Sequence, residues 1–309
     1  MIKFTLKKII LIATISFSLQ ASSQSDVKLS SFFLTPISYN PAYAGSYEGI
    51  TVTSIYSSQW VGFEGAPETL FINGHGTFLS ANTGLGAEIV HDEIGVTTNT
   101  KILANFAYHI NLSDKWRLSM GIKAGGSWYS VDYDRLNIED PNELEGLSGE
   151  VNENTLNFGT GLYLHTDDFF IGLGVPNLLK TKYYDAYKNT LANSNPNYYL
   201  SMGYKFELVD NWSFQPSVLS RVTKGSPVNT LLAGTFNWNE KVYGSLNIDL
   251  KASIGGFFGV RVAEQFFVGY SYDTSINSFV NVNNGIHTFF LNFRLDDYWQ
   301  RKRCGCYTF

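Results

Sequence analysis

A two-residue alternation between apolar and polar side chains constrains the fold of this chain more than any other feature. In KWRLSMGIKAGGSWYS, residues 115–130, the even positions are apolar with Trp116 and Trp128 near the ends, and the odd positions include Lys115, Arg117 and Lys123. Successive side chains of a strand point to opposite faces of its sheet. Twelve residues tilted by about 40° rise roughly 30 Å, the height of an outer-membrane barrel with its aromatic girdles. The pattern predicts a strand that crosses a membrane.

The same alternation recurs along the chain. We expect strands near residues 50–61, 68–80, 84–91, 96–110, 115–131, 152–164, 168–175, 197–208, 212–221, 228–238, 241–250, 253–262, 266–273 and 286–295. The count is even, as a single-chain bacterial barrel requires. A water-soluble sandwich also alternates, but it seldom carries aromatic residues at both ends of its long strands. The sequence therefore predicts an all-β fold, an up-and-down antiparallel transmembrane β-barrel of about 14 strands.

The connections between these segments alternate in length. Short turns read SANT, LSDK, HTDD, VDN, NEK and AEQ, and the other set comprises VGFEGAPE, HDEIG, 132–151, 176–196, 222–227, LKAS and 274–285. Short turns lie on the periplasmic side of such barrels and longer loops lie outside. Paired glycines (Gly84 and Gly86, Gly159 and Gly161, Gly172 and Gly174) fall on one strand face. They predict strong curvature or close packing in the lumen.

The first residues read as a secretory signal peptide. MIKFTLKKIILIATISFSLQASSQ combines lysines, an apolar core of about eleven residues and small residues before a cleavage site near Ser23/Gln24. Cleavage removes three lysines and no acids, so the net charge of −5 becomes −8. An acidic exported chain argues against nucleic acid as a partner. We expect the outer membrane of a Gram-negative bacterium as the location, with lipid around a multi-pass barrel.

No catalytic or cofactor motif is present, so we expect a protein that is not an enzyme. The five histidines lack ligand spacing, and neither a P-loop nor a Gly-x-Ser-x-Gly motif occurs. Acidic residues in 132–150 could supply oxygen ligands to Ca²⁺, although their order does not match an EF-hand and exposed acidic loops are usually only solvated. Cys304 and Cys306 could form a local disulfide, bind a soft metal or pair with another chain.

Nine charged residues are expected to face the lumen. They carry both signs: Lys101, Arg117, Lys123, Lys205, Glu207, Lys241, Asp249, Arg261 and Arg294. Two interpretations remain open. The charges can pair across a hydrated lumen, as a polar interior requires, or they can grip a polypeptide or tune ion flow.

The segment between the signal peptide and the first strand is aromatic and nearly free of charge. It reads FFLTPISYNPAYAGS, residues 32–46. We expect residues 28–48 to fold back into the periplasmic mouth of the barrel, with the prolines holding irregular backbone and the aromatic rings burying apolar area; the alternative is a flexible lead-in. The expected division is a signal peptide at 1–23, a plug-like segment at 24–48, the barrel at 49–296 and a periplasmic tail at 297–309.

Two sequence boxes carry a family resemblance. Asn-Pro-Ala-Tyr-Ala-Gly at 40–45, followed by Gln-Trp-Val-Gly and Gly-Ala-Pro within 59–67, resembles the start of the PorP/SprF family of Bacteroidota outer-membrane proteins. Residues of these boxes, together with the aromatic residues just before the first box, are candidates for plug or partner contact: Phe32, Phe33, Tyr39, Asn40, Pro41, Tyr43, Gly45, Gln59, Trp60, Gly62, Gly65 and Pro67. The second box is expected to form the first extracellular hairpin.

The resemblance implies a role linked to the type IX secretion system. One branch of the family belongs to the secretion and gliding-motility machinery, and other members act as outer-membrane partners of large surface proteins with a C-terminal sorting domain. We therefore expect a barrel that binds and anchors such a surface protein, or helps to export it, together with other secretion components. A passive diffusion porin for small solutes is the alternative, and occlusion of the lumen distinguishes the two.

Overall fold

The computed structural model describes residues 31–47, 49–78, 80–136, 149–184, 190–250, 252–276 and 284–296. In the first half of the chain the strands are β1 (Gly49–Gln59), β2 (Glu68–Phe78), β3 (Ser80–Ile94), β4 (Thr97–Asn111), β5 (Arg117–Asp132), β6 (Glu150–His165), β7 (Phe169–Val175), β8 (Thr181–Tyr184) and β9 (Thr190–Ser194). In the second half they are β10 (Asn197–Tyr204), β11 (Phe206–Glu207), β12 (Trp212–Thr223), β13 (Asn229–Trp238), β14 (Val242–Asp249), β15 (Ser253–Arg261), β16 (Phe266–Ser275) and β17 (Ile286–Asp296).

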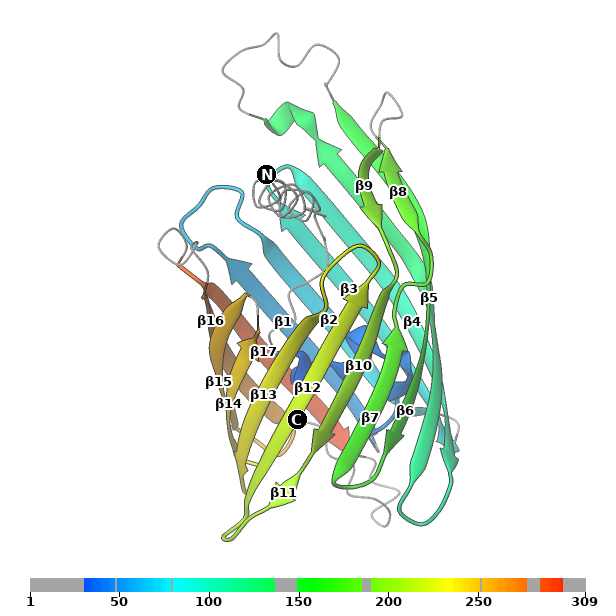
Figure 1. The fold of residues 1–309 in the computed structure, drawn as a ribbon, viewed down its shortest axis with the longest axis vertical. Helices are drawn as coiled ribbons and strands as arrows, with labels where there is room; N and C mark the ends of the chain where they lie inside the picture. Colours follow the sequence, from blue (N-terminus) through cyan, green and yellow to red (C-terminus); the bar gives the residue numbers. More distant parts are fainter. Residues whose placement is uncertain are drawn as a thin grey trace, which may run out of the picture.

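These strands form a closed antiparallel barrel (Figure 1). Neighbours in sequence pair with each other, β10 joins β7 to β12, and β1 closes the barrel by pairing with β17 from Gly49↔Asp296 to Gln59↔Ile286. Because β10 and β11 are one strand interrupted at Lys205, the described residues form 14 barrel strands. Each predicted strand has its counterpart, so the predicted fold class is confirmed.

The two faces of the wall differ as the alternation predicts. On β5, the Ile122 side chain on the outer face is 60% exposed, whereas the neighbouring Lys123 on the inner face is 1% exposed. The outer face is an almost continuous surface of Leu, Ile, Phe, Tyr and Trp, which in water would be a large unfavourable apolar area. A closed sheet with an apolar exterior has no edge to expose to hydrocarbon, so this surface fits a bilayer.

Two predicted connections are wrong. SANT is not a turn, because β3 already begins at Ser80 and the β2–β3 pairing carries a register shift at Thr77/Phe78. HDEIG is not a loop, because β3 continues to Ile94 and the turn lies at Gly95, where φ is +60°. In both places polar residues lie at the ends of a strand, beyond the apolar band, where polarity no longer marks a turn.

The wall has unequal height. β3 to β6 each contain 15 or 16 residues, whereas β7 contains seven. β8 and β9 form a separate two-stranded sheet beside the upper part of β6 (Figure 1). None of the described helices is long and apolar enough to cross a membrane.

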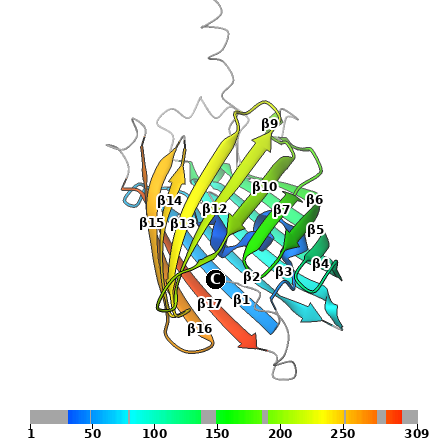
Figure 2. The ribbon, with the colours of Figure 1, turned by 60° about the horizontal axis from the view of Figure 1, so that its bottom comes forward.

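The N-terminal segment lies inside the barrel, in the half that carries the short turns (Figure 2). It consists of three short helical turns, η1 (Phe32–Leu34), α2 (Pro36–Tyr39) and η2 (Pro41–Tyr43), and nearly every residue from 31 to 46 is buried. The signal peptide, residues 137–148 of the acidic loop, and the tail with Cys304 and Cys306 lie outside the described residues. Among those described, no group of His, Cys, Asp or Glu side chains is arranged to hold a metal ion.

Candidate functional site

The candidate site is the contact between residues 31–47, called the plug below, and the barrel lumen. Local sequence explains the irregular backbone of the plug. Pro36 and Pro41 each stand at the first position of a turn, where the missing N–H costs nothing and the fixed φ suits the helix. Asn40 separates the turns, and its side-chain oxygen accepts a hydrogen bond from the Ala42 amide at 3.0 Å. The chain thus stays compact without forming a longer helix.

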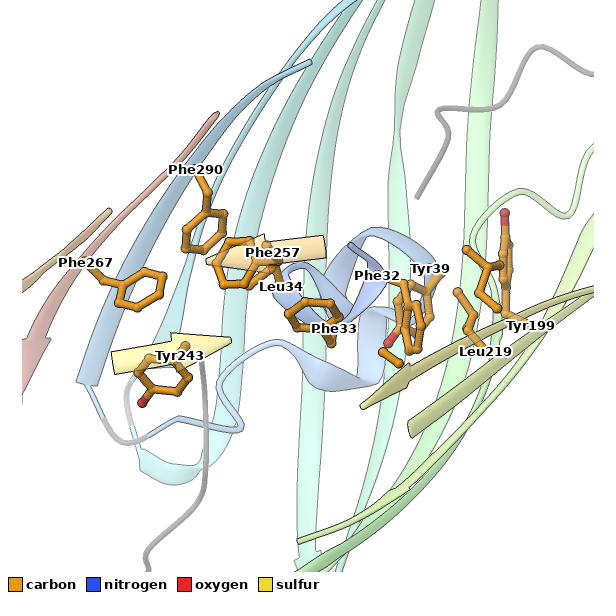
Figure 3. Packing of buried hydrophobic residues seen from close by; sticks show 12 residues of the cluster. Phe32, Phe33, Leu34, Tyr39, Tyr199, Leu219, Tyr243, Phe257, Phe267 and Phe290 are labelled. Atoms are coloured by element: carbon orange, nitrogen blue, oxygen red, sulfur yellow. The ribbon is translucent and has the colours of Figure 1, made fainter. Parts of the chain in front are cut away.

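One side of the plug packs against aromatic side chains of the wall. Phe32, Phe33 and Tyr39 are at most 3% exposed and join a cluster with residues of β10 and of β12 to β17. The ring centroids of Phe33 and Phe257 lie 5.7 Å apart, and those of Tyr39 and Tyr199 lie 5.8 Å apart (Figure 3). Each buried aromatic side chain contributes on the order of 2 kcal/mol, so this side supplies much of the docking free energy.

A second apolar cluster holds the other half of the plug. Ile37, Ala42, Tyr43 and Ala44 contact Phe71, Val90, Ala107 and Tyr163 of the wall. The Tyr43 ring lies between His75 and Tyr163, with centroid distances of 5.5 Å to each ring.

Burial raises the pKa of the Tyr39 phenol, which belongs to the first cluster, far above its ordinary value, so the hydroxyl stays neutral inside the lumen.

Glycines of the wall let the plug backbone approach closely. A Cβ atom at Gly84 would lie closer than 3.0 Å to the Ala44 carbonyl, one at Gly121 to the Ala42 backbone, and one at Gly161 to the Asn40 side chain. Real Cβ contacts are not that short, so these positions exclude larger residues while the plug is in place. The prediction of close lumen packing is confirmed for Gly84, Gly86, Gly161, Gly172 and Gly174; Gly159 instead accommodates Pro176.

A buried lysine binds the plug through its backbone. The Lys123 ammonium donates to the carbonyl oxygens of Ile37 and Ser38, each at 3.0 Å, and forms an ion pair with Glu88 at 2.6 Å. Asn105 donates to the same Glu88 carboxylate at 2.6 Å. Lys123 was expected to face the lumen, and the structure confirms this position. Nothing in the sequence indicated its partners, which are Glu88 on β3 and two backbone carbonyls of the plug.

Asn40 and Gly45 fix the plug at two further places. The Asn40 side chain donates to the Leu162 carbonyl on β6 at 2.9 Å. Gly45 has φ of +70°, a conformation that favours glycine, and its amide donates to Nδ1 of His75 at 3.4 Å. The family box at 40–45 therefore consists of residues whose side chains or backbone contact the lumen wall.

The second box lies at the opposite end of β1. The Gln59 amide donates to the Pro67 carbonyl at 2.9 Å, and the Trp60 amide donates to the Gly285 carbonyl at 2.9 Å. Gly62 and Gly65 adopt φ of +102° and +71°, so they shape the turn as expected. The structure brings the plug residues together and places the 59–67 hairpin away from them, so the twelve candidate residues form two separate regions.

A serine–histidine contact exists in the lumen but is inaccessible. Ser119 Oγ and His109 Nδ1 lie 2.6 Å apart, and both side chains are fully buried. The cavities beside the plug have volumes of about 50 and 20 Å³, room for a few water molecules. This pair is therefore part of the packing beneath the plug.

The family model of the type IX secretion system membrane protein PorP/SprF matches residues 21–293. The chain belongs to this family. It is an outer-membrane β-barrel, and both boxes fall within the matched range. No curated protein matches it in sequence.

Solved structures share the barrel fold at low identity. The CymD monoaromatic hydrocarbon channel is 11% identical, with a TM-score of 0.56 over 86% of this chain and 94% of that one. The outer-membrane protein Omp33 of Acinetobacter baumannii is 9% identical, with a TM-score of 0.50 over 81% of this chain and 100% of that one. At such identities the likeness concerns the fold alone.

Proposed function

We propose that this chain is a non-enzymatic, non-conducting outer-membrane partner in type IX secretion. It binds and anchors, or helps to export, a surface protein that carries a C-terminal sorting domain. The observation that carries the proposal is the buried plug, because a barrel whose lumen is filled by its own chain is suited to holding a partner rather than passing solutes. Family membership supports the link to secretion.

The energetics of the plug argue against passive diffusion. Four aromatic side chains of the plug are almost completely buried, and each contributes about 1.5–3 kcal/mol. These values are upper estimates, since a displaced plug would still bury part of this area. Even half of the summed free energy keeps the fraction of barrels with a displaced plug below about one in a hundred. If this barrel served as a porin, the plug would keep it closed to small solutes nearly all of the time.

Because the plug closes the lumen, a partner can bind at the end of the barrel that carries the long loops. That end includes the strands that extend above the apolar band. The 59–67 hairpin presents Trp60 and Phe63 there, each about half exposed. Exposed aromatic residues on a rigid turn are the kind of anchor that protein interfaces use. This end faces the cell surface when the short turns face the periplasm.

Affinity purification from the native outer membrane tests the proposal. The tagged full-length chain is extracted in mild detergent, and the proteins that follow it are identified by mass spectrometry. We expect one large surface protein with a C-terminal sorting domain, and no steady conductance of the purified barrel in planar bilayers. A barrel recovered alone that conducts ions steadily would contradict the proposal and support the porin alternative.

A further inference from the structure

The upper part of β6 has one neighbouring strand instead of two. β6 pairs with β5 along its whole length, from Glu150↔Asp132 to His165↔Arg117. β7 pairs with it only from Thr160 to His165. Among the residues that the structure describes, 150–157 have no backbone partner on the β7 side. A closed barrel otherwise leaves no such edge.

The ladder between β6 and β7 ends at Val175. Pro176 follows the last residue of β7, and its missing amide lies on the side of the strand that faces β10. One bond follows, from the Leu178 amide to the Phe158 carbonyl at 2.7 Å. The N–H and C=O of one strand residue point the same way, and the direction repeats every second residue. The backbone groups of Asn152, Asn154 and Leu156 therefore face the open side.

This edge crosses the outer rim of the apolar band. Trp128 on β5 lies opposite Asn154, and the outward side chains below it, Leu156 and Phe158, are 65% and 45% exposed. Above them the outward residues are polar, Asn152 and Asn154. The open edge thus begins at the membrane surface and continues outside the bilayer, where a partner can reach it.

The neighbouring hairpin does not close the edge. β8 lies beside β6, but its ladder is with β9, and the two form a sheet of their own (Figure 1). A row of alternating donors and acceptors about 7 Å apart is complementary to another extended strand and to little else. The geometry of this edge therefore requires an extended strand as its binding partner.

We infer that the open edge of β6, residues 150–157, is a docking strand, to which an extended segment of the surface protein adds as a further strand. This inference rests on the proposed function and names the place and mode of binding. The added strand lies above β7 in line with it and continues the sheet. Main-chain hydrogen bonds supply affinity, and alternate side chains of the segment contact Asn152, Asn154 and Leu156.

A second copy of this chain does not fit the edge. Barrel strands tilt by about 40°, so two barrels with the same orientation in one membrane would bring their β6 edges together at a crossing of roughly 80°. Antiparallel pairing of the two edges would require one barrel to be inverted in the membrane. Strand pairing needs nearly aligned backbones, so an identical partner is excluded on geometry.

Charge indicates which segment is favoured. Glu150 and Glu153 lie on β6, Asp132 ends β5, and Asp134 follows it in η3. Nearby, Arg135 is already paired with Glu93 at 3.2 Å. Lys180 precedes β8 and Lys182 lies on it, on the other side of the edge. The four carboxylates outnumber these two bases, so an extended segment that carries Lys or Arg is electrostatically complementary to the β5 side of the edge.

The test uses the full-length chain in its native membrane, with two matched double variants. Asn152→Pro with Asn154→Pro removes two amides that face the open side, a substitution that edge strands tolerate because the ladder to β5 is untouched. Asn152→Ala with Asn154→Ala removes the same side chains and keeps the amides. Resistance of the folded barrel to unheated SDS verifies that both variants fold.

We expect recovery of the surface protein to fall at least about tenfold in the proline variant and to stay within about twofold in the alanine variant. A photo-crosslinking amino acid at position 152 should attach to one segment of that protein, whereas one at Val222, on the outer face of β12, should not. Equal recovery with both variants overturns the inference and leaves the proposed function standing. Crosslinks to a second copy of this chain also overturn it. Absence of any surface protein with the unaltered chain overturns both.

Discussion

Two parts of the plug are held in the same lumen by different means. Residues 32–34 use side chains, which interdigitate with aromatic residues of β15 to β17 and their neighbours. Residues 40–45 use backbone, which lies directly on glycines of β3, β5 and β7. Side-chain packing buries apolar area and can adjust through a change of rotamer. Backbone that lies on a glycine has no such freedom to relieve a clash. The first contact should therefore provide affinity and the second should fix position.

The largest effect is expected where backbone meets glycine. Gly84→Val combined with Gly121→Val places side chains where the Ala44 carbonyl and the Ala42 backbone lie, at two separate points, so the costs should add to about 4 kcal/mol or more. We expect the plug to leave the lumen and the barrel to conduct in planar bilayers. Gly244→Ala is the control, since a Cβ there meets nothing within 4 Å. If the double variant does not conduct, the proposed role of the glycines is contradicted.

The next effect concerns the buried ion pair. Glu88→Ala leaves Lys123 charged in a buried site, with only the two plug carbonyls and no counter-ion, at a cost of about 3 kcal/mol. Thermal unfolding of the detergent-solubilised barrel should show a lower midpoint. The double variant Glu88→Met with Lys123→Met should recover part of the loss. If the double variant is as unstable as the sum of its single variants, the two residues are not coupled.

A smaller effect is expected on the aromatic side. Phe33→Leu keeps most of the apolar volume next to Phe257, so docking should weaken by about 1–1.5 kcal/mol. The measurement is the fraction of time that single barrels conduct, compared with the unaltered chain. An effect as large as that of the glycine pair would remove the distinction between the two parts of the plug.

The smallest effect should come from one hydroxyl. Tyr39→Phe keeps the ring against Tyr199 and loses the hydrogen bond between the phenol and Ser201. The expected change is about 1 kcal/mol, measured by protease protection of the plug. Ser201→Ala should match it, because either change removes the same bond. Different results for the two variants would show that the hydroxyl has another partner.

The barrel could be predicted because its signal is local. Alternation along a single strand reports which face meets lipid, and the turns interrupt it at regular intervals. The errors at SANT and HDEIG arose where strands run past the apolar band, since polar residues there are compatible with both strand and turn. The aromatic and proline content of residues 32–46 likewise indicated a compact buried segment.

The partners within the lumen could not be predicted, because they depend on register between strands. Lys123 and Glu88 lie on β5 and β3, with Asn105 of β4 between them. No spacing in the sequence links the three. Gly121 was missed for a related reason: it continues the polar face of an ordinary strand, and its role appears only when Ala42 is placed against it. The open edge of β6 also required the β6–β7 register.

The position of the plug in the chain bears on how the barrel assembles. The plug precedes β1, yet the centroid of its Tyr47 ring lies 4.9 Å from the guanidinium carbon of Arg294, on the strand that pairs with β1 to complete the ring. A plug that docks early contacts strands on both sides of the last seam and so favours the pairing of β1 with β17. Loss of the plug should then delay membrane insertion even when the final barrel is stable.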